Sequence, residues 1–469
     1  MRRTVGIIAL VLSGSVGYAV GEKCQPPKEY GVAAIDAYIG CYVKDRGIPG
    51  LSVAIVRDGN VALERGYGKA SIAAGAPAAP ETLFAVGSVT KQFTSTCILL
   101  LAGEGKLSVI DPVSKYLPGL TCAGDITLLD LMNHVSGYPD FYPLDFVDRR
   151  LVAPIAADEL ARRYATGALD FEPGTRYSYS NTGFIILGLV VEKVSGQPFG
   201  QFLQERILTP LGMTHSAFEP EKSGPGFATG YTSFGLAPWE PAVYEARGWM
   251  GAAGALWASP SDLARWDLAL MAGRVLEPEQ YALMTTPRRL GEGRTTAYGC
   301  GLDVTEPRGI TVLSHGGAVS GFLAENTMIP ATRSALVLLT NCEDSTSLSK
   351  LNDALLTLLM PPAQPVPRVT GPPAAEVAKE LFAQLQTGRV DQAHLGEEFG
   401  IYLTPKRVRD ASGQLKRWGQ PKSVEILRMS ERGGMETARL RMVFKSGALR
   451  VLMRRTPDGL VQEFLVERE

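Results

Sequence analysis

Residues 86–95, VGSVTKQFTS, place Ser88 three positions before Lys91 at the start of a segment with helical apolar periodicity. Residues i and i+3 lie on one face of a helix, so the two side chains are predicted to be neighbours in its first turn. A serine hydroxyl becomes a good nucleophile when a base takes its proton. A lysine amine can be that base when burial and a helix N-terminus disfavour its ammonium form. The segment thus indicates a nucleophile with its base, although Ser-x-x-Lys alone is more often a chance pair on a surface helix.

Two more segments carry groups suited to the same chemistry. In YSYSN, residues 177–181, Tyr179 and Asn181 alternate and could point into one cleft, the phenol sharing proton transfer with a lysine and the amide binding a substrate amide. In SHGGAVSG, residues 314–321, Gly317 would let a substrate lie against a strand, and the N–H of Ala318 could join that of Ser88 in holding an oxyanion. Taken separately, the first segment is better explained as a buried tyrosine with a turn asparagine, and the second as a glycine-rich strand end.

In this order, FAVGSVTKQFTS, YSYSNTGF and LSHGGAVSG resemble the Ser-x-x-Lys, Tyr-x-Asn and Lys/His-x-Gly motifs of the serine β-lactamase and penicillin-binding-protein-like hydrolases. The tyrosine in the second motif is similar to the class C β-lactamase branch, which includes D,D-peptidases, D-aminopeptidases and family VIII esterases. Other segments also look like that family, among them LLDLMNHVSGYPDF and GAAGALWASPSDLARW. The resemblance covers about residues 30 to 360 and does not extend to the tail.

The resemblance implies a penicillin-recognising serine hydrolase fold of the α/β class, in which an antiparallel sheet flanked by helices lies beside an all-helical region. It implies the catalytic residues Ser88, which carries the acyl group, Lys91, which activates it, and Tyr179, which passes a proton to the leaving group. It also implies a substrate-binding set, namely Asn181, His315, Gly317 and Ala318, with the N–H groups of Ser88 and Ala318 as the oxyanion hole. No metal and no organic cofactor is expected.

His315 departs from the lysine that typical β-lactamases and carboxypeptidases carry in the third motif. A lysine there would offer a permanent positive charge to a substrate carboxylate, whereas histidine is mostly neutral at pH 7. Histidine at this position looks more like the D-aminopeptidase and esterase members. The expected substrate is therefore an ester or a peptide with a D-residue. A class C-like β-lactamase is the alternative, and a non-catalytic protein that binds peptidoglycan or β-lactams is a second one.

Composition also limits the kinds of partner that the protein is expected to bind. The 47 basic and 48 acidic residues leave a formal net charge of −1, which is no electrostatic footprint for nucleic acid or an anionic membrane. The chain has neither a Cys-x-x-Cys nor a His-Glu-x-x-His motif, and its four histidines are far apart, so metal catalysis has no local support. Composition thus favours a small or neutral partner, and the resemblance implies that this partner is an ester, peptide or β-lactam substrate. The oligomeric state stays open.

The N-terminus is typical of an export signal, with two arginines before an apolar run from Val5 to Leu12 and small residues near position 20. We expect residues 1–21 to be cleaved and the protein to be periplasmic or secreted. A membrane anchor is the alternative, but the run is shorter than the roughly 20 apolar residues that cross a bilayer. An oxidising compartment would allow one or two bridges among the six cysteines, whose pairing the sequence leaves open.

The predicted domains are the hydrolase at residues 22–360, a proline-rich linker at 361–373 and a small accessory α+β domain at 374–469. Strand-like runs occur at both ends of the first domain, with mostly helical sequence between them, so one antiparallel sheet built from both ends is expected. The tail combines a helical pattern, AAEVAKELFAQLQTG, with four strand-like runs. It contains no cluster suited to nucleophilic or acid-base chemistry, so a stabilising or substrate-shaping role is expected, with ligand binding by its sheet as the alternative.

Overall fold

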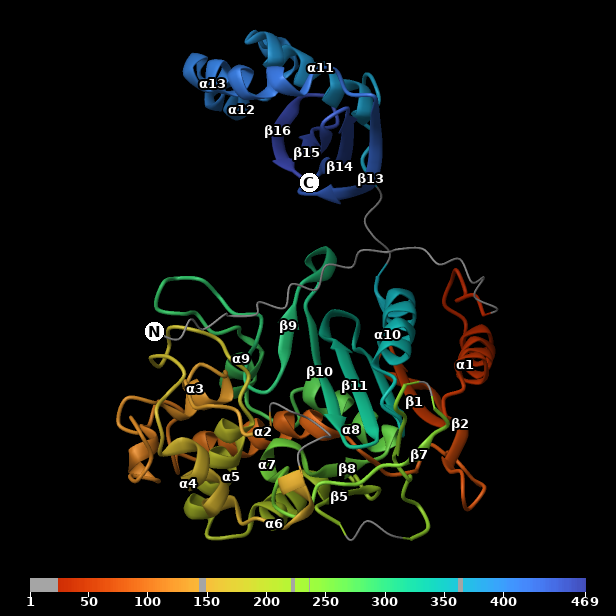
Figure 1. The fold of residues 1–469 in the computed structure, drawn as a ribbon, viewed down its shortest axis with the longest axis vertical. Coiled ribbons are helices and arrows are strands. Elements are labelled where there is room, and N and C mark those ends of the chain that lie inside the picture. Colours follow the sequence, from red (N-terminus) through yellow and green to blue (C-terminus); the bar gives the residue numbers. More distant parts are fainter. Residues whose placement is uncertain (1–23, 143–148, 221–223, 236, 362–365) are drawn as a thin grey trace. The chain divides into compact units, whose positions relative to one another are not determined.

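The computed structural model describes residues 24–142, 149–220, 224–235, 237–361 and 366–469 (Figure 1). The expected signal peptide, residues 1–21, lies outside them. The chain forms two compact units, residues 1–360 and 361–469. No helix among the described residues is both long enough and apolar enough to cross a bilayer.

The first unit is built around a seven-stranded sheet with the order β3-β2-β1-β12-β11-β10-β9, in which every neighbouring pair is antiparallel. Its strands are β1 (Gly50–Arg57), β2 (Asn60–Ser71), β3 (Ala76–Pro77), β9 (Asp303–Thr305), β10 (Val312–Val319), β11 (Phe322–Ile329) and β12 (Ser334–Thr340). Because β1 pairs with β12, the two ends of the unit meet in the centre of the sheet, as the sequence predicted.

Both faces of this sheet are covered. Alternate residues of β1 point to opposite sides, so Val53 and Ile55 pack with α1 (Val32–Arg46) and α10 (Ser345–Leu359), whereas Ala54 and Val56 face the helical region. On that second face α8 (Pro260–Met271) lies against β1 and β12. The expected α/β architecture, an antiparallel sheet flanked by helices, is confirmed (Figure 1).

The helical region lies between β2 and β9 in the chain. Besides α8, its α-helices are α2 (Thr90–Gly103), α3 (Leu128–Met132), α4 (Ala157–Ala165), α5 (Asn181–Ser195), α6 (Phe199–Leu203), α7 (Gly251–Gly254) and α9 (Pro278–Thr285). The apolar sequence of α5 is buried along most of its length, and Gly196 ends the helix in the left-handed conformation (φ 72°). Ser259 begins α8 by accepting a hydrogen bond from the Asp262 N–H. Short strands complete the region: β4 (Phe84–Ala85), β5 (Ser216–Phe218), β6 (Tyr231–Thr232), β7 (Glu240–Pro241) and β8 (Leu256–Ala258).

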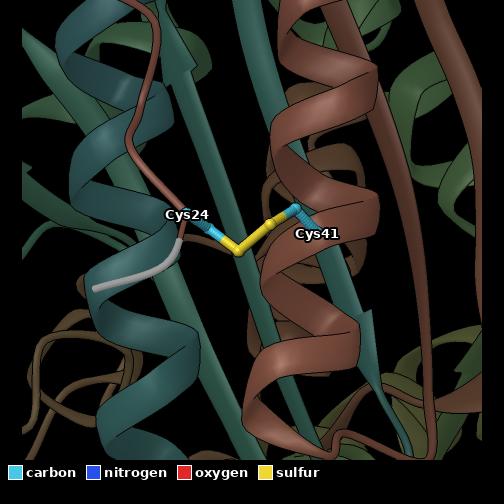
Figure 2. Close-up of a disulfide and its surroundings, with 2 residues drawn as sticks. All are labelled: Cys24 and Cys41. Carbon is cyan, nitrogen blue, oxygen red and sulfur yellow. A yellow bond between two sulfur atoms is a disulfide. The ribbon is translucent and has the colours of Figure 1, made fainter. Parts of the chain in front are cut away.

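One disulfide joins Cys24 to Cys41, with 5.9 Å between their Cα atoms (Figure 2). It ties the segment before α1 to the middle of that helix. The sequence had left the pairing open. The other four cysteines, Cys97, Cys122, Cys300 and Cys342, are free thiols.

The second unit is an α+β module, as predicted. Its antiparallel sheet has the order β13-β14-β15-β16, formed by β13 (Ser423–Arg432), β14 (Met435–Phe444), β15 (Gly447–Arg455) and β16 (Val461–Arg468). Its helices are α11 (Ala374–Thr387), α12 (Glu397–Tyr402) and α13 (Pro405–Leu415). Apolar residues from the sheet and from α11 and α12, such as Phe382, Phe399 and Leu440, form its own core.

A buried polar network joins α2 and α8 to β11 beneath the site described below. The Trp266 indole donates to Gln92 Oε1 (2.9 Å), and the Gln92 amide donates to Asn326 Oδ1 (3.0 Å). Asn326 Nδ2 in turn donates to both carboxyl oxygens of Asp267 (2.9 Å each). Asp267 is fully buried, and burial raises the pKa of its carboxyl well above the usual range.

We therefore predict that Asp267→Asn stabilises the protein increasingly as the pH rises. A carboxyl whose pKa is raised on folding contributes its full stability below its unfolded pKa of about 3.9 and loses it as the pH rises toward the folded value. Asparagine does not titrate and still offers an oxygen to Asn326. Thermal unfolding should give a difference in Tm between variant and wild type that is larger at pH 8 than at pH 4.5. Asp45→Asn, at an exposed position of α1, is the control, and a difference that shrinks with pH would contradict the prediction.

Candidate active site

Ser88 lies in a 3₁₀ turn, Gly87–Val89, that leads directly into α2, and Lys91 occupies the second position of that helix. The one-turn separation brings Lys91 Nζ to 2.9 Å from Ser88 Oγ. The Lys91 side chain is fully buried, whereas Ser88 is partly exposed and lines a cleft. A hydroxyl that can reach a substrate thus lies in hydrogen-bond contact with a buried amine.

The Lys91 amine also contacts Asn181 Oδ1 (2.7 Å) and the carbonyl oxygen of Ala253 (2.7 Å). These partners come from the first residue of α5 and from α7. A neutral amine has two N–H groups and one lone pair. It can therefore donate to both oxygens while its lone pair accepts the proton of Ser88. The arrangement suits a base that removes the hydroxyl proton.

Tyr179 lies beside this pair. Its ring centroid is 4.8 Å from Lys91 Nζ, and its side chain lines the same cleft. Burial raises the pKa of the Tyr179 phenol above its ordinary value, and the hydrogen bond with Ser88 opposes that rise. The phenol is therefore protonated at neutral pH and can give a proton to a leaving group.

Asp140, which sequence reasoning assigned no role, fixes the orientation of Asn181. Its Oδ1 accepts from the Asn181 backbone N–H (3.0 Å) and from Asn181 Nδ2 (3.1 Å). The amide oxygen of Asn181 is thereby turned toward Lys91. The segment LLDLMNHVSGYPDF had been noted only for its likeness to the family, and the sequence alone gave no sign that Asp140 contacts Asn181.

Two glycines allow the backbones of the first and third motifs to touch. Gly87 has a φ of 51°, and a Cβ there would lie 2.7 Å from the Ala318 nitrogen. A Cβ on Gly317 would lie 2.0 Å from the Val86 carbonyl oxygen. Side chains at either position would push the segments apart. The two backbone N–H groups predicted to bind an oxyanion, those of Ser88 and Ala318, thus belong to segments in direct contact.

The edge of β10 borders the cleft. Strand β9 pairs with β10 only at Val312–Ser314, so β9 leaves residues 315–318 without a partner on that edge. An extended substrate could add there as a strand.

His315 is buried and has hydrogen-bond partners for both ring nitrogens. The Tyr298 hydroxyl lies 2.7 Å from Nε2, and the carbonyl oxygen of Gly316 lies 2.6 Å from Nδ1. This pattern fits a neutral ring whose Nδ1–H donates to the carbonyl while Nε2 accepts from the phenol. Burial is the main cause that lowers the pKa of His315 to about 3. The third motif therefore presents no positive charge at neutral pH.

The cleft has a volume of about 410 Å³ and brings together all seven predicted residues except Lys91, which lies just beneath it. Three carboxyl groups also line it, those of Asp140, Asp303 and Glu325. Burial raises the pKa of Asp303 to about 6. Burial, with the neighbouring charges of Asp303 and Asp353, raises the pKa of Glu325 to about 7. Among the described residues, no group of histidine, cysteine and acidic side chains could hold a metal ion.

Known proteins resemble this chain in sequence over most of its first unit. The family model described as Beta-lactamase matches residues 35–359. A D-aminopeptidase of Brucella canis is 31% identical over 337 residues, which are 71% of this chain and 64% of the relative. The chain thus covers less than two thirds of that relative.

Two solved structures are also similar to this chain. The D-amino acid amidase from Ochrobactrum anthropi SV3, in complex with D-phenylalanine, is 26% identical with a TM-score of 0.60, covering 69% of this chain and 98% of that one. The octameric penicillin-binding protein homologue from Pyrococcus abyssi is 22% identical with a TM-score of 0.62 and covers 90% of each chain. This last likeness concerns the fold alone.

Gly316 and Gly317 are neighbours in β10, but only Gly317 lies against the backbone of Val86. Substitutions at the two positions therefore test this contact. Gly317→Ala should lower kcat/KM at least about a hundredfold, since displacing oxyanion donors costs about that much. Gly316→Ala should stay within a few-fold of wild type, because its Cβ would be 3.6 Å from the nearest atom, Glu325 Oε1, an ordinary contact. Steady-state kinetics on an ester substrate measure both. Equal losses in the two variants would show that the contact between Gly317 and Val86 does not hold the site.

Proposed function

Because this chain belongs to the beta-lactamase family, a family of serine hydrolases, we propose that it is an exported hydrolase that forms an acyl-enzyme on Ser88. We propose further that its preferred substrates are peptides or amides with a free N-terminal D-residue, esters being turned over by the same chemistry. The observation that carries the proposal is the 2.9 Å contact between Lys91 Nζ and Ser88 Oγ at the floor of the cleft.

In the proposed acylation step, Ser88 Oγ attacks the substrate carbonyl carbon while its proton moves to Lys91 Nζ. The carbonyl oxygen becomes an oxyanion, which the N–H groups of Ser88 and Ala318 stabilise. The carbon–nitrogen bond then breaks, and Tyr179 gives its proton to the departing amine and regains one from Lys91.

Deacylation reverses these roles. A water attacks the ester carbonyl and gives one proton to Tyr179, which passes its own proton to the neutral Lys91 amine. Ser88 Oγ then leaves and takes the proton back from Lys91. The acid is released, and the three side chains return to their starting protonation states.

The charges around the cleft support a substrate with an ammonium group. Asp140, Asp303 and Glu325 line it, and His315 is neutral. Ionised carboxyl groups attract an ammonium ion and repel the carboxylate that β-lactams carry. The names of the relatives, a D-aminopeptidase and a D-amino acid amidase, agree with this reading. A β-lactamase therefore ranks second.

Export is supported by the signal-like N-terminus and by the disulfide between Cys24 and Cys41, since such bonds persist mainly in oxidising compartments. Fractionation of cells that express the full chain tests this part. Protein found only in the cytosol, with both thiols reduced, would contradict it.

The acyl-enzyme and its base are tested together. A fluorophosphonate or fluorescent penicillin should leave one covalent adduct, located on Ser88 by mass spectrometry. Lys91→Ala should lower the rate of adduct formation and of turnover at least about a hundredfold, the usual cost of losing a general base. Lys106→Ala, at an exposed lysine paired with Glu104, is the control. Absence of any adduct would favour a binding protein, and a wild-type rate in Lys91→Ala would remove lysine from the mechanism.

The preference for an ammonium group should depend on pH. Because the carboxyl groups of Asp303 and Glu325 ionise around pH 6 to 7, KM for a D-alanyl amide should fall between pH 5 and pH 7, below the pKa of about 8 of the substrate's own amine, whereas KM for its N-acetylated form should not. Glu325→Gln should raise KM for the amide alone, and Glu279→Gln, at an exposed position of α9, should change neither. Nitrocefin as the only efficient substrate would overturn the assignment and favour the β-lactamase.

A further inference from the structure

His134 is a buried histidine beside the catalytic residues that the proposed chemistry does not use. It lies two residues after the end of α3, and its backbone has a φ of 58°, a left-handed conformation uncommon for residues other than glycine. Its side chain is 1% exposed. The conformation turns both its carbonyl group and its ring toward the segment that carries Tyr179.

Two hydrogen bonds connect His134 to the residues on either side of Tyr179. The Ser178 N–H donates to the His134 carbonyl oxygen (3.0 Å), and the Ser180 N–H donates to His134 Nδ1 (3.1 Å). In an extended segment, alternate N–H groups point the same way, so His134 receives both N–H groups that flank the tyrosine. The backbone of Tyr179 is thereby fixed on one side.

The imidazole also lies on the tyrosine ring. The ring centroids of His134 and Tyr179 are 4.2 Å apart with an angle of 33° between the ring planes. Phe184 and Tyr298 pack around the same imidazole, with centroids 5.1 Å and 4.8 Å away. This aromatic cluster leaves the phenol little freedom to rotate.

The hydrogen bond from Ser180 also sets the protonation state of His134. Because Nδ1 accepts an N–H, the ring proton lies on Nε2, and a second proton on Nδ1 would face another donor. Burial is the main cause that lowers the pKa of this imidazole well below its usual value. His134 therefore acts as a neutral acceptor and a flat contact surface and adds no charge beside the lysine.

Resting on the proposed function, we propose that His134 is a positioning residue for Tyr179, which holds the phenol where it delivers a proton to the leaving group. Phenylalanine at this position would keep the ring contact but lose the acceptor for Ser180. Asparagine would keep an acceptor atom at the place of Nδ1 and tolerates positive φ, but would lose the ring. The two substitutions thus separate the two contacts.

The test compares two substrates with the same acyl group. D-alaninamide needs a proton on its leaving nitrogen, whereas D-alanine p-nitrophenyl ester releases a stable phenolate. Tyr179→Phe and His134→Phe should both lower kcat/KM for the amide at least about tenfold, within the range of general-acid effects, and for the ester less than about threefold. The double variant should lose no more than Tyr179→Phe alone, and His134→Asn should recover part of the loss. His394→Asn, at an exposed position of the second unit, is the control.

Burst titration with the ester gives the fraction of competent sites, so the rates refer to folded enzyme. Equal losses for the two substrates in His134→Phe, or losses that add to those of Tyr179→Phe, would overturn the inference while leaving the proposed function in place. If His134→Phe does not fold, His134→Asn alone must show the loss that is selective for the amide. Equal losses for both substrates in Tyr179→Phe would instead overturn the proton transfer on which the proposed function rests.

Discussion

The buried amine of Lys91 is the group on which the arrangement of the site depends. Taking an amine out of water is costly unless its hydrogen bonds are made, and here the partners come from three separate places along the chain: Ser88, Asn181 and Ala253. Each partner must be in place for the amine to remain buried. The packing of α2 against α5 and α7 is therefore also the condition for the chemistry proposed at Ser88.

Close backbone contact is the second constraint. Gly87 and Gly317 lie far apart in the sequence, and the structure brings their backbones together because the sheet is built from both ends of the first unit. The interaction holds only where both positions lack a side chain. The topology of the sheet thus sets how close Ser88 lies to Ala318, whose N–H is the second proposed oxyanion donor.

The histidines around the site are neutral, whereas the carboxyl groups that line the cleft can ionise. This difference in charge bears on which substrates the cleft can bind. His315 and His134 are buried and neutral, each with a ring nitrogen committed to a neighbour, so neither supplies positive charge. Asp303 and Glu325 lie in the cleft with raised pKa values. A cleft with acidic walls favours a cationic substrate group, whereas the acyl-transfer chemistry itself depends on none of these charges.

Much of the fold could be predicted from sequence because its signals are local. The Asp58-Gly59 hairpin, the helix start at Ser259 and the helix end at Gly196 each follow from the conformational preferences of a few neighbouring residues. The placement of Lys91 one turn after Ser88 is equally local. The other residues of the predicted site followed from the resemblance of three short motifs to those of a known family.

Contacts between distant segments could not be predicted in this way. The sequence by itself indicated Ser88 and Lys91 as the candidate nucleophile and base through their helical spacing, and Tyr179 as the candidate proton donor through the resemblance of the motifs. Only the tertiary structure decided that Asp140 orients Asn181, that His134 flanks Tyr179 and that Cys24 pairs with Cys41. These contacts join residues 17 to 46 positions apart through backbone turns and burial, and no local propensity encodes which distant partner a polar group will meet.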